Sequence, residues 1–338
     1  MTALPQPAAI TEVDGELDAE RFADLRRKGQ PVVFRGLIAG WPAVRAAQVG
    51  DEAMARYMAR EPSTRPVTAI AAPPSARGRF FYTEDLARLN FTSGQGRLET
   101  FMQDLLAASA MRDVPALAVQ SEDIGELLPL FAAENQLALV PRVRPRIWIG
   151  NRIRVAPHYD LMENVACCVA GRRRFTLFPP DQLGNLYPGP FELTPAGTPV
   201  SMVDTAAPDL EKYPRYEQAW AAASQATLDP GDAIYIPYCW WHGVESLDPL
   251  NILVNYWWNE GDPEGIGSPY NALLHGVMSL RHLSPQKKAV WKTMFDYYVF
   301  AEHGDPVGHL PEQARGLFGA PSLALFARMR ELIRGLLR

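Results

Sequence analysis

The chain has 338 residues, of which 47% are hydrophobic and 21% charged, and its formal net charge is −5. This composition is typical of a soluble globular protein and excludes a disordered chain. Acidic and basic residues are mixed along the sequence, which argues against nucleic-acid binding and against a polybasic membrane anchor.

The N-terminus and the cysteines indicate the cellular compartment. The first residues, MTALPQPAAITEVDGELD, have neither a cationic start nor an apolar run, so we expect no secretory signal. No apolar segment approaches the ~18 residues of a membrane-spanning helix. Of the three cysteines, Cys167 and Cys168 are adjacent and Cys239 is distant, so neither a disulfide framework nor a CxxC pair is present. We therefore predict a cytoplasmic protein.

Helical and extended patterns alternate in the first 151 residues. Residues 17–30 predict a helix, and the β-branched run PVVFRGL, 31–37, predicts a strand. Residues 51–60 and 97–111 carry apolar residues at a spacing of three to four, which indicates two further helices. The segment RPRIWIGN, 144–151, predicts a strand.

The middle of the chain carries a β pattern. From 147 to 258, short β-type runs alternate with Gly/Pro turns, which predicts an antiparallel sandwich or barrel rather than βαβ units. Between about 181 and 227 lies a proline-rich segment with little periodicity. An irregular segment of this length inside a compact domain is usually a lid or a binding surface.

The last part of the chain carries a helical pattern. Helical periodicity begins after Ser268 and recurs in three segments, 270–283, 285–300 and 322–337. The sequence therefore predicts a mainly β domain over residues 1–265, flanked by N-terminal helices, and a C-terminal helical region over 266–338.

The last helix has an apolar stripe. Its members recur at helical spacing and are Leu323, Leu325, Phe326, Met329, Leu332, Ile333 and Leu336. The helix could pack on its own β-core, as most terminal amphipathic helices do. Because the β-core should be closed before Ser268, we instead expect the stripe to lie against a second copy of the chain, giving a homodimer.

Polar residues gather at the start of the β region. In the segment VAPHYDLMEN, His158, Asp160 and Asn164 share one parity. Such a pair of histidine and aspartate is by itself more often a satisfied surface or core group than a metal site. The alternatives are therefore a solvated strand end followed by a charged turn, or a metal site beside an anion-binding cation.

The arginines that follow have different environments. Arg173 shares a strand face with Phe175 and Leu177, whereas Arg172 and Arg174 fall on the other face. An arginine on the apolar face requires an anionic partner when it is buried.

A second histidine comes from the segment LDPGDAIYIPYCWWHGVESL. Pro230 and Gly231 predict a type II turn, because proline fixes φ at its first central position and glycine accepts a positive φ at the next. If the strand that follows is regular, Ile234, Ile236 and His242 leave it on the same side. Two histidines and a carboxylate then converge on the interior, the set that holds non-haem Fe(II) on one face and leaves positions open for a keto acid and dioxygen.

The two segments resemble a known family. HYDLMEN, GRRRFTLFPPDQLGNLYPGP, PGDAIYIPYCWWHGVESL and VNYWW are similar to motifs of the JmjC-type cupin-like hydroxylases. The similarity is greatest to the asparaginyl hydroxylase factor inhibiting hypoxia-inducible factor and its bacterial relatives. The resemblance implies a double-stranded β-helix (the jelly-roll fold of cupins) and an Fe(II)- and 2-oxoglutarate-dependent dioxygenase. It also implies a homodimer formed through C-terminal helices.

The resemblance also assigns residues. It places His158, Asp160 and His242 as metal ligands. The positions that it assigns to the 2-oxoglutarate site are Asn164, Asn255, Trp257 and Arg173, the last replacing the usual lysine. Gln120 matches a substrate-facing glutamine, and Val155 and Ala118 replace a hydroxyl residue and a tyrosine that contact the co-substrate.

The expected reaction is hydroxylation of a substrate C–H bond by Fe(II), 2-oxoglutarate and O2. The resemblance favours a protein or peptide side chain as substrate, although a small molecule remains an alternative. Oxidative N-demethylation uses the same kind of site and is a second hypothesis. A non-catalytic cupin that binds a metal or a ligand is a third, which the changes at Val155 and Ala118 would favour.

Overall fold

The computed structural model of the protein describes residues 4–14, 17–259 and 268–336. The chain divides into two compact units, Met1–Asn259 and Glu260–Arg338. The predicted domain boundary between residues 265 and 266 lies outside the described residues.

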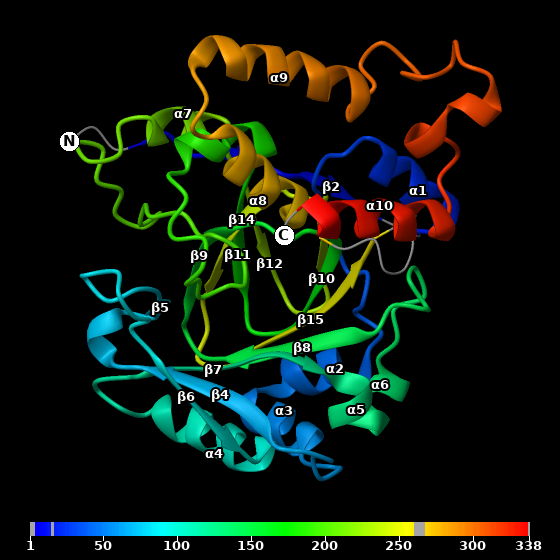
Figure 1. The fold of residues 1–338 in the computed structure, drawn as a ribbon. Helices are drawn as coiled ribbons and strands as arrows, with labels where there is room; N and C mark the ends of the chain where they lie inside the picture. The colour runs from blue at the N-terminus through cyan, green and yellow to red at the C-terminus, as the bar shows by residue number, and fades with distance from the viewer. Residues whose placement is uncertain (1–3, 15–16, 260–267, 337–338) are drawn as a thin grey trace. The chain divides into compact units, whose positions relative to one another are not determined.

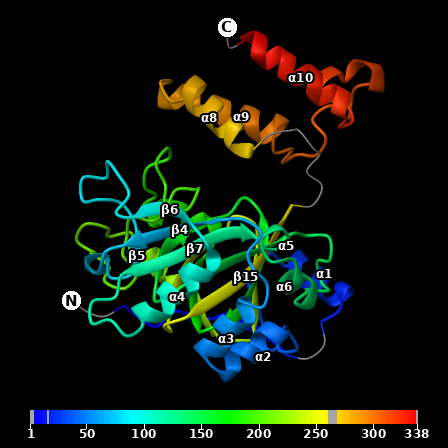
Figure 2. The ribbon, with the colours of Figure 1, turned by 90° about the horizontal axis from the view of Figure 1, so that it is seen from below.

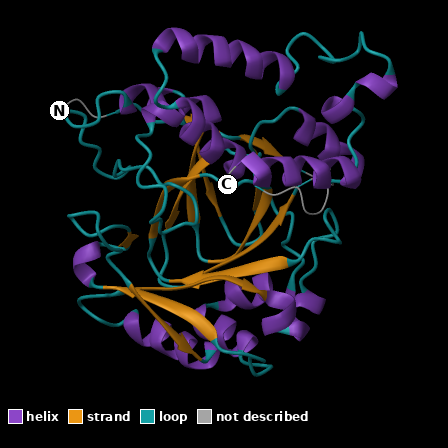
Figure 3. Ribbon diagram, in the orientation of Figure 1, coloured by secondary structure: helices purple, strands orange, loops and turns teal. Residues whose placement is uncertain are grey.

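Two mixed β-sheets form the first unit (Figures 1 and 3). The six-stranded sheet contains, in order, Ala8–Ala9 (β1), Ser224–Leu228 (β12), Arg173–Phe178 (β11), Trp241–Ser246 (β14), Arg154–His158 (β9) and Arg79–Phe80 (β5). The nine-stranded sheet contains, in order, Thr11–Val13 (β2), Val32–Phe34 (β3), Ala233–Ile236 (β13), Glu163–Ala170 (β10), Asn251–Trp258 (β15), Pro145–Gly150 (β8), Ala116–Asp123 (β7), Val67–Ala72 (β4) and Thr92–Gly96 (β6).

The strand directions agree with the predicted antiparallel arrangement. Strands between β8 and β15 pair antiparallel with one another, and the parallel pairs all involve the N-terminal strands β1, β2 or β5. This mainly β architecture with flanking helices agrees with the predicted jelly-roll fold.

An apolar core fills the space between the inner faces of the two sheets. Its buried members come from both sheets and include Phe175, Leu177, Val244, Ile234, Ile236 and Leu253. Cys168 lies in this core, whereas Cys167 lies in the core on the other side of the nine-stranded sheet. Adjacent strand residues point to opposite faces, so β10 is buried on both sides.

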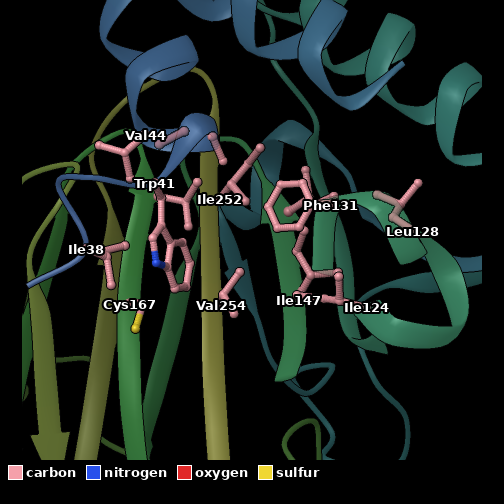
Figure 4. Close-up of a cluster of buried hydrophobic side chains, with 14 of the residues drawn as sticks. Ile38, Trp41, Val44, Ile124, Leu128, Phe131, Ile147, Cys167, Ile252 and Val254 are labelled. Carbon is pink, nitrogen blue, oxygen red and sulfur yellow. The ribbon is translucent and has the colours of Figure 1, made fainter. Parts of the chain in front are cut away.

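Helices cover the outer face of the nine-stranded sheet. They are Ala19–Arg27 (α1), Pro42–Val49 (α2), Asp51–Met58 (α3), Leu98–Ala108 (α4), Ile124–Leu127 (α5) and Pro129–Glu134 (α6). Helices α2, α3 and α4 lie side by side in two perpendicular views (Figures 1 and 2). Figure 4 shows Trp41 and Phe131 packed with Ile147, Ile252 and Val254 of the sheet.

The insert between 181 and 227 is more ordered than predicted. It begins in a 3-10 helix, Pro180–Asn185, and contains the helix Tyr216–Ala221 (α7). Tyr216 and Ala219 of α7 are fully buried and pack with Phe178 and Trp241 on the outer side of the six-stranded sheet. The expectation of an irregular segment was therefore wrong for these parts of it.

The second unit is helical, at the three predicted segments. It contains Pro269–Leu280 (α8), Pro285–Tyr298 (α9) and Leu323–Leu336 (α10), with two 3-10 turns, Glu312–Ala314 and Gly316–Phe318, between α9 and α10. Ser268 and Ser284 cap the first two helices by accepting hydrogen bonds from backbone N–H groups. Within the described ranges, no helix combines the length and the apolar character needed to cross a membrane.

Candidate functional site

The structure brings His158, Asp160 and His242 together. One potential ligand atom from each lies within 4.8 Å of the other two. His158 ends β9, Asp160 follows in the next loop, and His242 lies near the start of β14. Strands β9 and β14 pair antiparallel with His158 directly opposite His242, so the sheet register itself sets the distance between the rings, whose centroids are 4.3 Å apart.

The path of the chain to His242 differs from the prediction. The turn before β13 has the predicted form, with Gly231 at φ 110° and a hydrogen bond from the Asp232 N–H to the Asp229 carbonyl. The strand does not continue regularly, because β13 ends at Ile236 and β14 begins in the other sheet.

A tight turn joins β13 to β14 instead. Cys239 adopts a left-handed conformation with φ 58°, and its N–H donates to the Asp160 carbonyl at 3.1 Å. His242 still faces the interior, because its partner across the ladder is the buried Leu177. The turn therefore both redirects the strand and holds the loop that carries Asp160.

Backbone carbonyls orient both imidazoles. The Nδ1 atom of His158 lies 3.0 Å from the Ala156 carbonyl, and the Nδ1 atom of His242 lies 3.0 Å from the Trp240 carbonyl. A carbonyl only accepts, so each Nδ1 carries the hydrogen, and each Nε2 is the nitrogen left to bind a metal. Burial, with the neighbouring His242, lowers the pKa of His158 to about 4, so this ring is neutral at pH 7.

The carboxylate completes a set that fits a metal ion. The Oδ2 atom of Asp160 is buried, has no hydrogen-bond partner among the described residues, and lies 3.6 Å from Nε2 of His242. Two imidazole nitrogens and one carboxylate oxygen, each with an unused lone pair, are the donors of the two-His-one-carboxylate Fe(II) sites. The three residues therefore fit Fe(II) by their chemistry.

Arg173 is a buried cation on the same inner face. Its side chain is on the same strand face as Phe175 and Leu177, and Arg173 is 5% exposed. Its Nε atom has no hydrogen-bond partner in the described part of the chain. Burial lowers the pKa of Arg173 to about 10, which still leaves it charged at pH 7. Arg172 and Arg174 instead pair with Asp248 and Glu245. An unpaired buried guanidinium requires an anion, and a carboxylate matches its planar fork.

Amides and indoles line the adjoining part of the inner face. Asn164 and Asn255 are buried on neighbouring strands, with 3.4 Å between Nδ2 of Asn255 and Oδ1 of Asn164. Trp148 donates from Nε1 to Oδ1 of Asn255 at 2.8 Å and packs edge-on against Trp257. The Nε1 atom of Trp257 is buried without a hydrogen-bond partner among the described residues. The amide of Asn255 is thus hydrogen-bonded within the protein, whereas the indole N–H of Trp257 is available to a ligand.

Val155 and Ala118, which replace a hydroxyl residue and a tyrosine of the family pattern, lie in apolar surroundings. Val155 lies opposite Val244 and packs on the core between the sheets, and Ala118 is buried opposite Gly150. Gln120 lies in a bulge of β7, where the pairing with β8 shifts register between Val119 and Glu122.

Two polar residues of the site were missed by the sequence analysis. Trp148 contacts both Asn255 and Trp257, and Ser246 lies directly opposite Arg173 with its Oγ atom buried and unpartnered within the described residues. The signal for Ser246 was available, because counting by two along β14 from His242 leads to Val244 and then to Ser246.

Comparison with known proteins gives a family match and several relatives. The model of the cupin-like domain matches residues 18–263. Over 150 residues the chain is 37% identical to a protein named lysine-specific demethylase JMJ31 from Arabidopsis thaliana, covering 40% of this chain and 27% of that protein. Over 115 residues it is 39% identical to an HSPB1-associated protein 1 homolog from Danio rerio, covering 33% and 24%.

A longer match is to Jumonji C domain-containing protein 5 from Drosophila melanogaster. The two are 30% identical over 255 residues, which is 72% of this chain and 59% of that protein. The chain thus spans about a quarter of the length of the first two relatives and somewhat more than half of the third.

Proposed function

The chain belongs to the cupin-like domain family, and from this premise we propose that it is an Fe(II)- and 2-oxoglutarate-dependent oxygenase that hydroxylates a substrate C–H bond. The observation that carries the proposal is the joint placement of His158, Asp160 and His242 with the unpaired Arg173 on one inner face. Either feature alone has ordinary structural explanations. Together they match a keto acid with a second carboxylate: the metal site fits the keto-acid end, and Arg173 fits the second carboxylate.

The iron, when bound with 2-oxoglutarate and O2, supplies an oxidant for C–H bonds while the keto acid is converted to succinate and CO2. The chain itself holds and orients the reactants. His158, His242 and Asp160 would hold the metal through one atom each, and the Ala156 and Trp240 carbonyls fix the two rings.

The inner face would also position the co-substrate. Arg173 would bind its second carboxylate through two parallel N–H donors. The Nε1 atom of Trp257 is a further donor in the same region. Asn164, on the neighbouring strand β10, lies directly opposite Trp257. The apolar Val155, Val244 and Leu177 exclude water from the space between these polar ends.

We favour hydroxylation over N-demethylation because the motifs HYDLMEN and PGDAIYIPYCWWHGVESL resemble those of the JmjC-type cupin-like hydroxylases. Arg146, a cation of β8, does not separate the two reactions, because Asp123 is its direct partner across the ladder with β7.

Demethylation remains the second candidate, because two relatives are named lysine-specific demethylases. A peptide library with one variable central residue, incubated with Fe(II), 2-oxoglutarate and air, separates the two. Our proposal predicts products heavier by one oxygen atom and no formaldehyde. Formaldehyde release from methylated-lysine peptides would favour the demethylase. The absence of any modified peptide, combined with no consumption of 2-oxoglutarate, would favour a non-catalytic binding protein.

A further inference from the structure

Ser246 carries a buried hydroxyl that has no hydrogen-bond partner among the described residues. It is the last residue of β14, it is 6% exposed, and within the described part of the chain its Oγ atom makes no hydrogen bond. Buried hydroxyl groups are normally paired, because an unpaired one loses its bonds to water without replacement. An unpaired hydroxyl on an inner face therefore indicates a ligand atom that completes it.

The β-sheet register places this hydroxyl beside Arg173. Ser246 and Arg173 are direct partners in the antiparallel ladder of β14 and β11, and Leu228 is the partner of Arg173 on its other side. Side chains of direct partners project to the same face, with Cβ atoms about 4.5–5.5 Å apart. The Nε atom of Arg173 also lacks a hydrogen-bond partner among the residues that the structure describes. Two neighbouring hydrogen-bond donors on the same face thus make no hydrogen bond to any described residue.

The neighbouring groups do not meet this need. Cys168, on β10, has its Sγ hydrogen directed to the Gly171 carbonyl at 3.0 Å. Val244, the next inner-face residue of β14, is apolar, and so is its ladder partner Phe175. Both donors are therefore available to one anion.

We propose that Ser246 donates its hydroxyl hydrogen to the same carboxylate that Arg173 binds, so that the two residues together select a keto acid with a second carboxylate. A carboxylate offers about four acceptor positions, enough for the two N–H groups of a guanidinium and one hydroxyl. Ser246 thereby provides the hydroxyl donor that Val155 and Ala118 do not. The inference rests on the proposed function, since it concerns the co-substrate of that site.

The test measures ligand binding rather than turnover. The full chain is loaded with Mn(II) under anaerobic conditions and titrated in a calorimeter with 2-oxoglutarate and, separately, with 2-oxopentanoate. The second compound has the same number of carbons and lacks the second carboxylate. Because a hydrogen bond to a charged group contributes about 1.5–3 kcal/mol, Ser246→Ala should weaken 2-oxoglutarate binding about 10- to 100-fold and leave 2-oxopentanoate binding unchanged.

Two further variants separate a binding role from a structural one. Glu245→Gln changes the adjacent residue, which pairs with Arg174 on the other face, and should leave both affinities as in the wild type. Ser246→Thr keeps the hydroxyl and should recover at least part of the lost affinity. Without keto acid, Ser246→Ala should melt at or above the wild-type temperature, because it removes an unpaired hydroxyl.

The outcomes that overturn the inference are distinct. Equal binding of 2-oxoglutarate by Ser246→Ala and the wild type removes Ser246 from the site. Equal weakening of both keto acids shows that the substitution disturbs the fold instead of one contact. A wild-type chain that binds Mn(II) and no 2-oxoglutarate overturns the proposed function itself, and this assignment with it.

Discussion

The metal ligands are the residues whose removal should have the largest and most local effect. We predict one Fe(II) per chain, and the loss of this stoichiometry in both His158→Ala and Asp160→Ala, because each removes one of three donors. The loss of affinity should exceed the ~10- to 100-fold typical of residues that only orient a ligand. The measurement is metal content after anaerobic loading and desalting. His275→Ala, in the second unit, is the control and should keep its iron; loss of metal there would place the site elsewhere.

The cation of the site should be specific to one of three adjacent arginines. Arg173→Lys keeps the charge and loses the planar fork, so the apparent KM for 2-oxoglutarate should rise. Arg172→Lys and Arg174→Lys are matched controls, because those side chains pair with Asp248 and Glu245. Steady-state kinetics on the three variants checks this. A larger effect in either control would contradict the placement of the anion on the inner face.

At the residue scale, the sequence predicted which candidate metal-ligand side chains come together, but it missed two polar residues of the site. Alternation along β11 correctly separated Arg173 from Arg172 and Arg174, because strand geometry is local. Trp148 and Ser246 were missed, because their significance lies in unpaired or shared hydrogen bonds across strands that only the folded register reveals. Whether the assigned residues bind metal and co-substrate remains a prediction.

At the scale of elements, the hairpin between β10 and β11 should be sensitive to a single methyl group. Gly171 has φ 66°, and a Cβ there would collide with the Leu250 carbonyl and the Asn251 side chain. We predict that Gly171→Ala lowers the free energy of unfolding by about 2 kcal/mol or more, by adding a steric clash to the backbone strain. Urea unfolding monitored by tryptophan fluorescence gives the value.

A second glycine isolates the two contributions. Gly36 has nearly the same φ, 67°, and no atom within 4 Å of its added Cβ. Gly36→Ala should therefore show the strain alone, about 1 kcal/mol. Equal destabilisation by the two substitutions would mean that the hairpin relaxes around the new methyl group.

Elements with a clear apolar periodicity were predicted, and several others were missed. Helices α1, α3 and α4, strand β3 and the strands from β8 to β15 follow from the sequence pattern, whereas β4, β6 and β7 were not predicted. Helices α2 and α7 were not predicted, because their stability comes from tertiary packing, of Val44 in the core and of Tyr216 against Phe178 and Trp241, which the local sequence does not contain. The count through β13 to His242 assumed one regular strand, and the change of sheet at Cys239 depends on contacts with the Asp160 loop.

At the scale of the whole molecule, the second unit carries apolar surface that its own helices leave uncovered. No residue of α8, α9 or α10 is buried, and the exposed apolar side chains include Leu274, Met278, Trp291, Leu332 and Ile333. Helices of 12 to 14 residues are marginal in isolation and gain stability from packing. We propose that this surface packs against the same surface of a second copy, giving a symmetric dimer.

The dimer predicts a concentration-dependent change of mass that one substitution abolishes. Light scattering at micromolar concentration should give the mass of two chains, and Leu332→Arg should reduce it to one by placing a charge in the apolar stripe. Arg328→Ala, on the same helix, is the control and should remain dimeric. A monomeric wild-type chain would contradict the proposal, and a dimer unaffected by Leu332→Arg would place the interface outside α10.

The central claim is that His158, Asp160 and His242 hold an iron that oxidises 2-oxoglutarate beside Arg173. Its most direct test is succinate formation from 2-oxoglutarate in air, compared between the wild type and Asp160→Ala with and without added Fe(II). The account predicts succinate from the wild type only when Fe(II) is present, and none from Asp160→Ala under either condition. Succinate from both proteins at the same rate, or from neither, would contradict it.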